Sequence, residues 1–216
     1  MRAFRKLTGV VAMSLMLAAP APAAPLTIAA LGDSLTQGYG LPAGQGFVPQ
    51  MEAWLADHGA KVTLINAGVS GDTTAGGLSR VDWTLSEPVD GMIVALGGND
   101  MLRGIDPAVT RANLEGIVNA AQDKGVAVLL VGLSAPGNYG PDYKRDFDAI
   151  FPALAQKHDI LLFPDFMAGL SRHTDMRGAA RDYMQPDGIH PNARGVELIV
   201  EAMGPKVLEL VERARQ

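Results

Sequence analysis

The sequence predicts an α/β protein in which helices cover a mostly parallel sheet, and three observations support this fold class. Short apolar runs of strand length recur along the chain, segments with apolar residues at helical spacing alternate with them, and the run over 126–131 has no polar alternation. Strands of that kind are covered on both faces, as in α/β sandwiches. The chain has 216 residues, 48% of them hydrophobic and 19% charged, which suits one domain with a substantial core.

The N-terminal segment has the pattern of a secretory signal. Positive charges within residues 2–6 precede a mostly apolar stretch over 7–19, and the small residues at 21–23 form a cleavage pattern. The apolar stretch is shorter than the roughly 20 residues that a membrane-spanning helix needs. We therefore expect residues 1–24 to be a signal peptide, residues 25–216 to form a single domain, and the mature protein to be periplasmic or secreted without an integral membrane segment.

The first half of the mature chain contains two predicted strands and one predicted helix. The apolar run 26–31 predicts a buried strand. Apolar residues recur at helical spacing over 47–55, and Gly59 follows as a stop signal, which together predict a helix. The run 62–65 predicts a second strand, and residues 66–71 are expected to form a loop.

The middle of the chain repeats this alternation. Residues 89–96 predict a third strand, and Asp106 followed by Pro107 predicts the N-cap and first residue of a helix. Gly125 stands where a glycine commonly ends a helix. The run 126–131 predicts a fourth strand, which should be covered on both faces because every one of its residues is apolar.

The last part of the chain is predicted to hold two helical regions and the fifth strand. Helical spacing over 143–154 predicts a helix that Pro152 kinks or breaks. Residues 160–163 predict the strand. Helical spacing over 196–211 predicts a terminal helix, which we expect to be interrupted at 204–205, a Gly-Pro pair.

Composition excludes several classes of site. The chain has no cysteine, which excludes a cysteine nucleophile, a thiolate metal site and a disulfide. It has no long basic run and an acidic charge balance, so we expect no nucleic-acid partner. Of the four histidines, those other than His190 fall outside any recognisable ligand spacing, so no metal site is expected.

Three candidate residues follow the first three predicted strands. Ser34 follows the first strand, Gly71 the second and Asn99 the third. The carboxyl ends of parallel strands meet at one edge of an open sheet, where ligands bind. There Ser34 would be a nucleophile, while the Asn99 amide and the Gly71 backbone N–H would face a developing oxyanion. Each residue also has a purely structural interpretation as a helix cap or turn residue.

Asp187 and His190 complete the candidate set. Their three-residue spacing in a turn bounded by glycine and proline lets one side chain reach the other. A carboxylate on one imidazole nitrogen leaves the other nitrogen free to accept a proton from a serine. The alternatives are a structural Asp–His pair or two metal ligands. Together with Ser34 and the donors, the pair supplies what acyl transfer requires. The competing class is a binding module that holds a small anion or acyl group without turnover.

The motifs that contain these residues resemble the SGNH, or GDSL-type, hydrolase family. Its four blocks occur here in order, as Gly32-Asp33-Ser34-Leu35, Gly71, Gly97-Gly98-Asn99-Asp100 and Asp187-Gly188-Ile189-His190-Pro191. Residues 66–73, 102–104 and 136–140 are similar to the bacterial periplasmic branch, known as thioesterase I, protease I, lysophospholipase or arylesterase. The resemblance covers nearly the whole mature chain.

The resemblance implies a flavodoxin-like three-layer α/β/α sandwich with a five-stranded parallel sheet. It implies that Ser34 is the nucleophile, that His190 is the base and that Asp187 orients this base. The backbone N–H groups of Ser34 and Gly71 and the side chain of Asn99 would form the oxyanion hole. This chemistry uses no cofactor and no metal.

The expected substrate is a small-molecule ester or thioester, such as an aryl ester, a lysophospholipid or an acyl-CoA. Residues 134–141 follow the fourth predicted strand and are expected to form one wall of the cleft, with Asn138 and Tyr139 as substrate-binding residues. An acyltransferase or a carbohydrate O-deacetylase of the same family is the alternative enzyme, and a flavodoxin-like small-ligand binding module is the alternative without catalysis.

Overall fold

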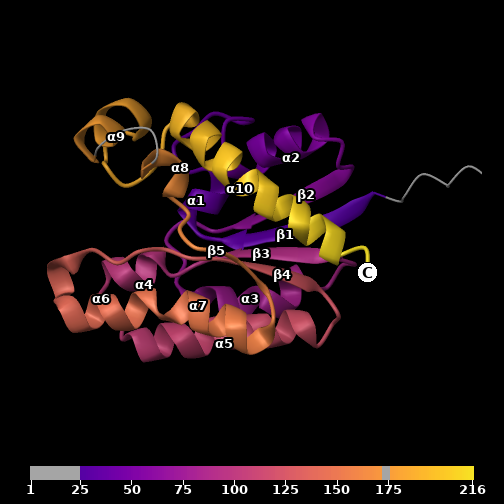
Figure 1. Cartoon of the computed structure of the whole chain (residues 1–216), viewed down its shortest axis with the longest axis horizontal. Helices are drawn as coiled ribbons and strands as arrows, with labels where there is room; N and C mark the ends of the chain where they lie inside the picture. Colours follow the sequence, from indigo (N-terminus) through magenta and orange to yellow (C-terminus); the bar gives the residue numbers. More distant parts are fainter. Residues whose placement is uncertain (1–24, 172–175) are drawn as a thin grey trace, which may run out of the picture.

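A five-stranded sheet forms the centre of the computed structural model, which describes residues 25–171 and 176–216 (Figure 1). All four strand pairings are parallel, and the strand order is β2-β1-β3-β4-β5. The strands are β1 (Leu26–Gly32), β2 (Val62–Gly68), β3 (Gly91–Ala95), β4 (Ala127–Val131) and β5 (Leu161–Phe163). The five-stranded parallel sheet with flanking helices confirms the predicted fold class.

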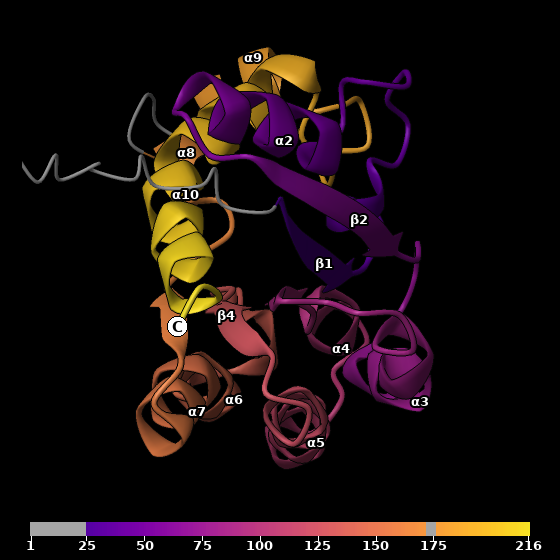
Figure 2. The ribbon, with the colours of Figure 1, turned by 90° about the vertical axis from the view of Figure 1, so that its right-hand side faces the viewer.

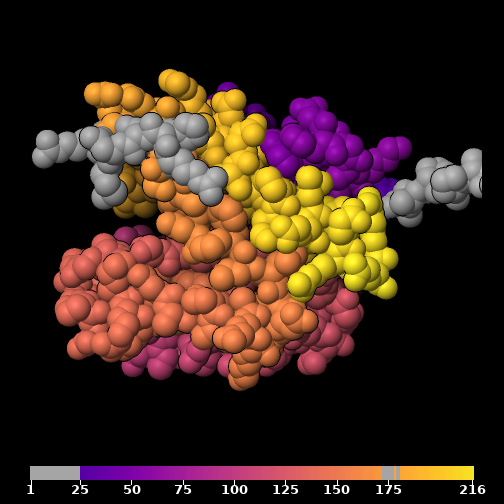
Figure 3. All heavy atoms as spheres, in the orientation of Figure 1, coloured from indigo at the N-terminus to yellow at the C-terminus, as the bar shows by residue number. Residues whose placement is uncertain are grey.

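Helices cover both faces of the sheet (Figures 1 and 2). One layer contains α1 (Ser34–Gln37), α2 (Phe47–Asp57), α8 (Ala168–Ser171), α9 (Met176–Tyr183) and α10 (Ala193–Arg213). The other contains α3 (Thr74–Thr84), α4 (Gly98–Leu102), α5 (Pro107–Gln122), α6 (Pro141–Asp148) and α7 (Ile150–His158), and a short 3₁₀ helix, η1 (Gly137–Tyr139), precedes α6. In the space-filling view, α10 (yellow) and the orange segment that includes α7 lie on the side that faces the viewer, one in each layer (Figure 3).

Two hydrophobic clusters, one on each face of the sheet, form the core. Ile28 of β1 belongs to the cluster under α2 and α10, whereas Ala29 and Leu31 belong to the cluster under α3, α5 and α7. These strand residues are fully buried, because successive side chains point to opposite faces and each face is covered. The continuous apolar runs in the sequence therefore reflect burial on both sides of the sheet.

The ends of the three strands that precede the candidate residues are aligned. Gly32, the last residue of β1, pairs with Gly68 of β2 and with Ala95 of β3. The segments that follow these strands, with Ser34 and Asn99 among their residues, therefore start from one edge of the sheet. This register brings to one place residues that lie far apart in the sequence.

The predicted helix signal acts as expected at the start of α5, and a second side chain caps α3. The Asp106 side chain accepts a hydrogen bond of 2.8 Å from the N–H of Ala108, and Pro107 occupies the first turn of α5. The Thr73 hydroxyl accepts from the N–H of Gly76 at the start of α3. These side chains satisfy N–H groups that a helix leaves without partners in its first turn.

Two local predictions differ from the structure. β2 continues to Gly68, through residues expected to form a loop, because its location at the edge of the sheet lets Asn66 be exposed within a strand. α10 runs without interruption through Gly204 and Pro205. Proline removes one backbone hydrogen bond, but the buried residues on both sides, such as Met203 and Val207, keep the helix packed on the sheet.

The helical region that contains Pro152 is broken, as predicted, but the break lies three residues before the proline. The helical region breaks at Ala149, between α6 and α7, and Pro152 lies in the first turn of α7, where a missing N–H costs little. The predicted signal peptide, residues 1–24, lies outside the described residues. No helix in the described ranges is long and apolar enough to cross a membrane.

Candidate active site

Ser34, His190 and Asp187 form a continuous chain of hydrogen bonds at the carboxyl edge of the sheet. The Nε2 atom of His190 lies 2.8 Å from the Oγ atom of Ser34. Its Nδ1 atom lies 2.7 Å from the Oδ2 atom of Asp187. Ser34 begins α1 directly after β1, whereas the other two residues lie in the loop between α9 and α10. The structure thus brings together the three residues that the sequence predicts as a triad.

The turn around Asp187 holds its carboxylate in the ionised form. The Oδ1 atom accepts the backbone N–H groups of Ile189, at 2.9 Å, and of His190, at 3.0 Å. Hydrogen bonds from the backbone and side chain of His190, followed by that from Ile189, lower the pKa of Asp187 to about 2. A carboxylate at this place favours the tautomer with the proton on Nδ1 of His190, which leaves Nε2 to accept the Ser34 proton.

Gln185 links the histidine loop to the segment that follows α1. Its backbone N–H donates to the carbonyl oxygen of His190 at 2.8 Å. Its side-chain Nε2 donates to the carbonyl oxygens of Tyr39, at 2.8 Å, and Pro191, at 3.0 Å. The ring of Tyr39 in turn lies 4.7 Å from the imidazole of His190, centroid to centroid. Sequence reasoning did not identify Gln185, because a single glutamine carries no motif.

Gly71 and Ser34 each present a backbone N–H that donates to no group within residues 25–171 and 176–216. Gly71 has a φ of +80°, a backbone conformation that other residues adopt only with strain. Its carbonyl oxygen accepts from the Nη2 atom of Arg103 at 2.8 Å. Ser34 is the first residue of α1, where helix N–H groups have no intrahelical partner. Free N–H groups of this kind are the donors that an oxyanion requires.

Asn99 is held between two of the segments that leave the sheet. Its Nδ2 atom donates to the carbonyl oxygen of Asp72 at 2.9 Å and lies 3.4 Å from the Oδ2 atom of Asp33. The second contact is long for a hydrogen bond, so the amide keeps donor capacity for a ligand. α4 begins next to this residue, after Gly97, whose φ of +116° requires glycine.

Asp33, next to the candidate nucleophile, is a buried carboxyl group with 2% exposure. Its Oδ1 atom accepts the N–H of Leu35 at 2.9 Å and so caps α1. Burial raises the pKa of Asp33 to about 6, against the opposing effects of the Leu35 N–H and the charge of His190. The sequence showed this aspartate only as part of a motif, because burial of a polar residue is not visible in a local pattern.

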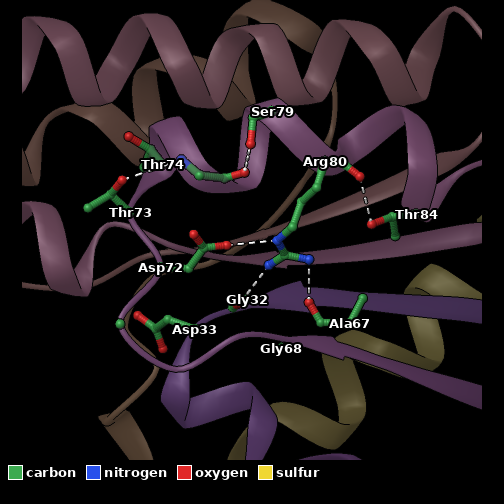
Figure 4. Close-up of polar contacts among 12 residues, drawn as sticks. Gly32, Asp33, Ala67, Gly68, Asp72, Thr73, Thr74, Ser79, Arg80 and Thr84 are labelled. Atoms are coloured by element: carbon green, nitrogen blue, oxygen red, sulfur yellow. Dashed lines mark hydrogen bonds and ion pairs between the residues drawn. The ribbon is translucent and has the colours of Figure 1, made fainter.

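Arg80 of α3 binds three segments behind the site (Figure 4). Its Nε atom lies 2.7 Å from the Oδ2 atom of Asp72. Its Nη1 and Nη2 atoms donate to the carbonyl oxygens of Ala67, at 2.8 Å, and Gly32, at 2.9 Å. Sequence reasoning did not identify this arginine, whose partners lie up to 48 residues away.

Asn138 and Tyr139, predicted to bind substrate, lie on η1. The Tyr139 hydroxyl donates to the carbonyl oxygen of Leu102 at 3.1 Å, and the residue is 45% exposed. Tyr139 thus packs beside the end of α4, the helix that carries Asn99. Among the described residues, neither Asn138 nor Tyr139 forms a hydrogen bond with the Ser34–His190–Asp187 chain.

A surface hollow of about 490 Å³ adjoins the histidine loop. It is lined by Gly40, Leu41, Gln45, Met184, Gln185, Pro186, Asn192, Ala193 and Arg194.

No group of three or more His, Cys, Asp or Glu side chains with the spacing of a metal site occurs in the part of the chain that the structure describes. The residues around Ser34 offer a hydroxyl, a base with an oriented tautomer and nearby amide donors, which are the groups used in acyl transfer.

The sequence is similar to that of esterases throughout most of its length. Residues 30–198 match the profile of the GDSL-like lipase/acylhydrolase family. Esterase TesA of Pseudomonas aeruginosa is 37% identical over 190 residues, which are 88% of this chain and 91% of that protein. An arylesterase of Vibrio mimicus is 33% identical over 180 residues, which are 83% of this chain and 86% of that protein.

Two further proteins extend this similarity. Thioesterase 1/protease 1/lysophospholipase L1 of Escherichia coli K12 is 34% identical over 187 residues, which are 86% of this chain and 85% of that protein. The crystal structure of AlinE4, an SGNH-hydrolase family esterase, superposes with a TM-score of 0.71 at 42% identity, covering 88% of this chain and 98% of AlinE4.

Proposed function

Because this chain belongs to the GDSL-like lipase/acylhydrolase family and is an esterase, we propose that Ser34, His190 and Asp187 form the catalytic triad through which it hydrolyses esters and thioesters. One observation carries the proposal: the hydrogen bonds from Asp187 to His190 and from His190 to Ser34 are continuous, at 2.7 and 2.8 Å. A binding module without turnover has no need of a base oriented toward a hydroxyl.

Acylation begins with the Ser34 hydroxyl. Nε2 of His190 accepts its proton as Oγ attacks the acyl carbon. Asp187 stabilises the imidazolium that forms, because its pKa of about 2 keeps it ionised at any pH at which the histidine base is neutral. The imidazolium then donates its proton to the leaving alcohol or thiol, and an acyl-serine remains.

The tetrahedral intermediate places a negative charge on the former carbonyl oxygen. We assign three donors to it: the backbone N–H groups of Ser34 and Gly71 and the amide of Asn99. Both N–H groups are free of other partners in the described part of the chain, so donating to the oxyanion breaks no existing hydrogen bond. Donors that are fixed before reaction stabilise the transition state without reorganisation.

Deacylation repeats these steps with water. His190 removes a proton from a water molecule that attacks the acyl-serine, the same donors hold the second oxyanion, and the proton returns to Oγ of Ser34. Each step uses only groups of this chain and water.

The names of the relatives suggest the substrate class. They are an esterase, an arylesterase and a thioesterase/lysophospholipase, so we propose small aryl esters, acyl thioesters and lysophospholipids as substrates. The signal-like pattern of residues 1–24 supports export to the periplasm or beyond. Asn138 and Tyr139, beside the helix that carries Asn99, are proposed to contact the substrate.

The test of the triad is Ser34→Ala on the mature protein. It should abolish hydrolysis of a p-nitrophenyl ester and labelling by a fluorophosphonate probe without unfolding the protein, because only the attacking oxygen is removed. Ser79→Ala is the matched control, since the Ser79 hydroxyl donates to the Gly76 carbonyl oxygen on the exposed side of α3, and it should label like wild type. Labelling of Ser34→Ala at the wild-type rate would refute the assignment.

A further inference from the structure

We propose that Arg80 is the positioning residue of the oxyanion hole: a single guanidinium fixes the relative places of the three segments that carry the donors. The inference rests on the proposed function, because it takes the Ser34 and Gly71 N–H groups and the Asn99 amide as the donors. Arg80 itself contacts none of the reacting atoms. It acts through the backbone and through Asp72.

The contacts of Arg80 fix the ends of two strands. Its guanidinium donates to the carbonyl oxygen of Gly32, the last residue of β1, and of Ala67, in β2. Gly32 lies two residues before Ser34, and Ala67 lies four residues before Gly71. Figure 4 shows the side chain extending from α3 across both strand ends. The separation between the two backbone donors is thus set by a rigid planar group.

Asp72 connects the third donor to the same arginine. Its carboxylate pairs with Nε of Arg80 at 2.7 Å, and its backbone carbonyl oxygen accepts the amide of Asn99 at 2.9 Å. Asp72 is also the residue after Gly71. Any displacement of Asp72 would therefore move the Gly71 N–H and the Asn99 amide together.

Partial burial of this ion pair supports a role beyond surface stability. The side chains of Arg80 and Asp72 are only 19% and 15% exposed. Taking two charges out of water costs free energy that their attraction offsets only when the remaining hydrogen-bonding groups are also satisfied. Here the guanidinium meets three oxygen atoms in a fork, an arrangement that lysine cannot reproduce because its ammonium is a point charge.

The expected effect follows from the precision that an oxyanion hole requires. Donors stabilise the charge when they lie about 2.7–3.1 Å from the oxyanion, and a misplacement of about 1 Å costs on the order of 10² in rate. Arg80→Gln should therefore lower kcat by about 10- to 100-fold. KM should stay close to wild type, because the groups that contact the bound ester are retained.

A transition-state-like inhibitor distinguishes positioning from a general loss of structure. A boronic acid forms a tetrahedral adduct with the serine, so its affinity for Arg80→Gln should fall by the same factor as kcat/KM. Arg80→Lys, which keeps the charge beside Asp72, should restore part of both. Two results would overturn the inference. In one, Arg80→Gln is folded and has the kcat of wild type. In the other, Arg80→Gln loses kcat but keeps the wild-type affinity for the boronic acid.

A second variant covers the case in which Arg80→Gln does not fold. Asp72→Asn keeps the size of the side chain and leaves the Arg80 bonds to Gly32 and Ala67 in place, but it weakens the link to the Gly71 segment. It should lower kcat and boronic acid affinity together, by less than Arg80→Gln, and equal values in Asp72→Asn and wild type would count against the proposal. The far-ultraviolet circular dichroism and Tm of each variant show whether it is folded.

Arg213→Gln is the matched control. Arg213 also donates to a distant backbone carbonyl oxygen, that of Asp159 at 2.8 Å, but it lies at the last residue of α10 and is exposed. Its loss should leave kcat and inhibitor affinity unchanged. Failure of the proposed function gives a different result, since Ser34→Ala would then retain activity, whereas failure of this inference leaves Ser34→Ala inactive and Arg80→Gln active.

Discussion

At the scale of single residues, two carboxyl groups within one site have opposite electrostatic environments. Asp187 is partly exposed and accepts two backbone N–H groups, which with the imidazole lower its pKa to about 2. Asp33 is buried, and burial raises its pKa to about 6. The first is suited to stabilise a cation on His190, whereas the second carries its charge at a cost in free energy.

Asp33 should make stability depend on pH. Its pKa in the folded protein lies above the ordinary value of 3.8, so the folded state binds its proton more readily. The contribution of Asp33 to the free energy of unfolding is therefore complete below about pH 4 and is lost as the pH rises through about 6. The change is on the order of 3 kcal/mol. The negative charges of Asp72 and Asp100 act in the same direction, and the charge of His190 opposes them.

Asp33→Asn tests this dependence, because asparagine does not titrate. The free energy of unfolding of both proteins is measured by urea unfolding between about pH 4 and pH 7. As the pH rises, the value for the variant minus the value for wild type should increase by up to about 3 kcal/mol. Titrating groups that do not interact with Asp33 are shared by the two proteins and cancel in the comparison. A difference that does not change with pH would mean that Asp33 titrates normally.

At the scale of secondary-structure elements, close packing of α10 on α2 depends on a glycine. A Cβ atom on Gly204 would lie 2.6 Å from ring atoms of Trp54, closer than carbon atoms approach each other. The Trp54 ring also stacks on His58, with centroids 3.6 Å apart, so it has little room to move. This contact explains why the glycine is useful inside a helix, where it otherwise lowers stability.

Gly204→Ala should therefore destabilise the protein, by about 1–3 kcal/mol as for other overpacked cores, although alanine favours helix formation. Thermal unfolding measures the effect as a lower Tm. Gly137→Ala is the control, because a Cβ there meets nothing within 4 Å, and its Tm should match that of wild type. An unchanged or higher Tm for Gly204→Ala would show that the two helices separate without cost.

At the scale of the whole molecule, Gln185 joins parts of the chain that lie 146 residues apart. Gln185→Ala removes its hydrogen bonds to the carbonyl oxygens of Tyr39 and Pro191 and should let the histidine loop shift. We expect kcat to fall by roughly 10-fold or more and the free energy of unfolding by about 1 kcal/mol per lost hydrogen bond. Gln45→Ala is the control, because Gln45 lines the same surface hollow but is exposed, and it should keep the kcat of wild type. Equal kcat values for Gln185→Ala and Gln45→Ala would contradict the role of Gln185 in holding the histidine loop.

Most of the fold could be predicted from the sequence, because strands that are buried on both faces consist of continuous apolar runs. Caps such as Asp106 are equally local signals, and they were predicted correctly. The continuity of α10 and the extension of β2 were not predictable, because the packing of Gly204 on Trp54 and the edge location of Asn66 are tertiary facts.

The candidate site divides in the same way. Motifs marked Ser34, Asp187 and His190, which the structure brings into contact. Gln185 and Arg80 lie in no recognisable motif, since their importance comes from carbonyl oxygens that only the folded chain places near them. The residues proposed to react are thus visible in the sequence, whereas the residues proposed to hold them in place are found only in the structure.

The Ser34 hydroxyl and its proposed base, His190, lie 156 residues apart in the sequence. During synthesis, therefore, Ser34 emerges early and stays an ordinary alcohol until the loop between α9 and α10 has been made and brings the imidazole of His190 to it. A truncated or half-folded chain would hold the nucleophile but lack its activation. Under the proposed triad, hydrolytic activity therefore requires that the chain be made at least as far as the histidine loop and that this loop be folded against α1.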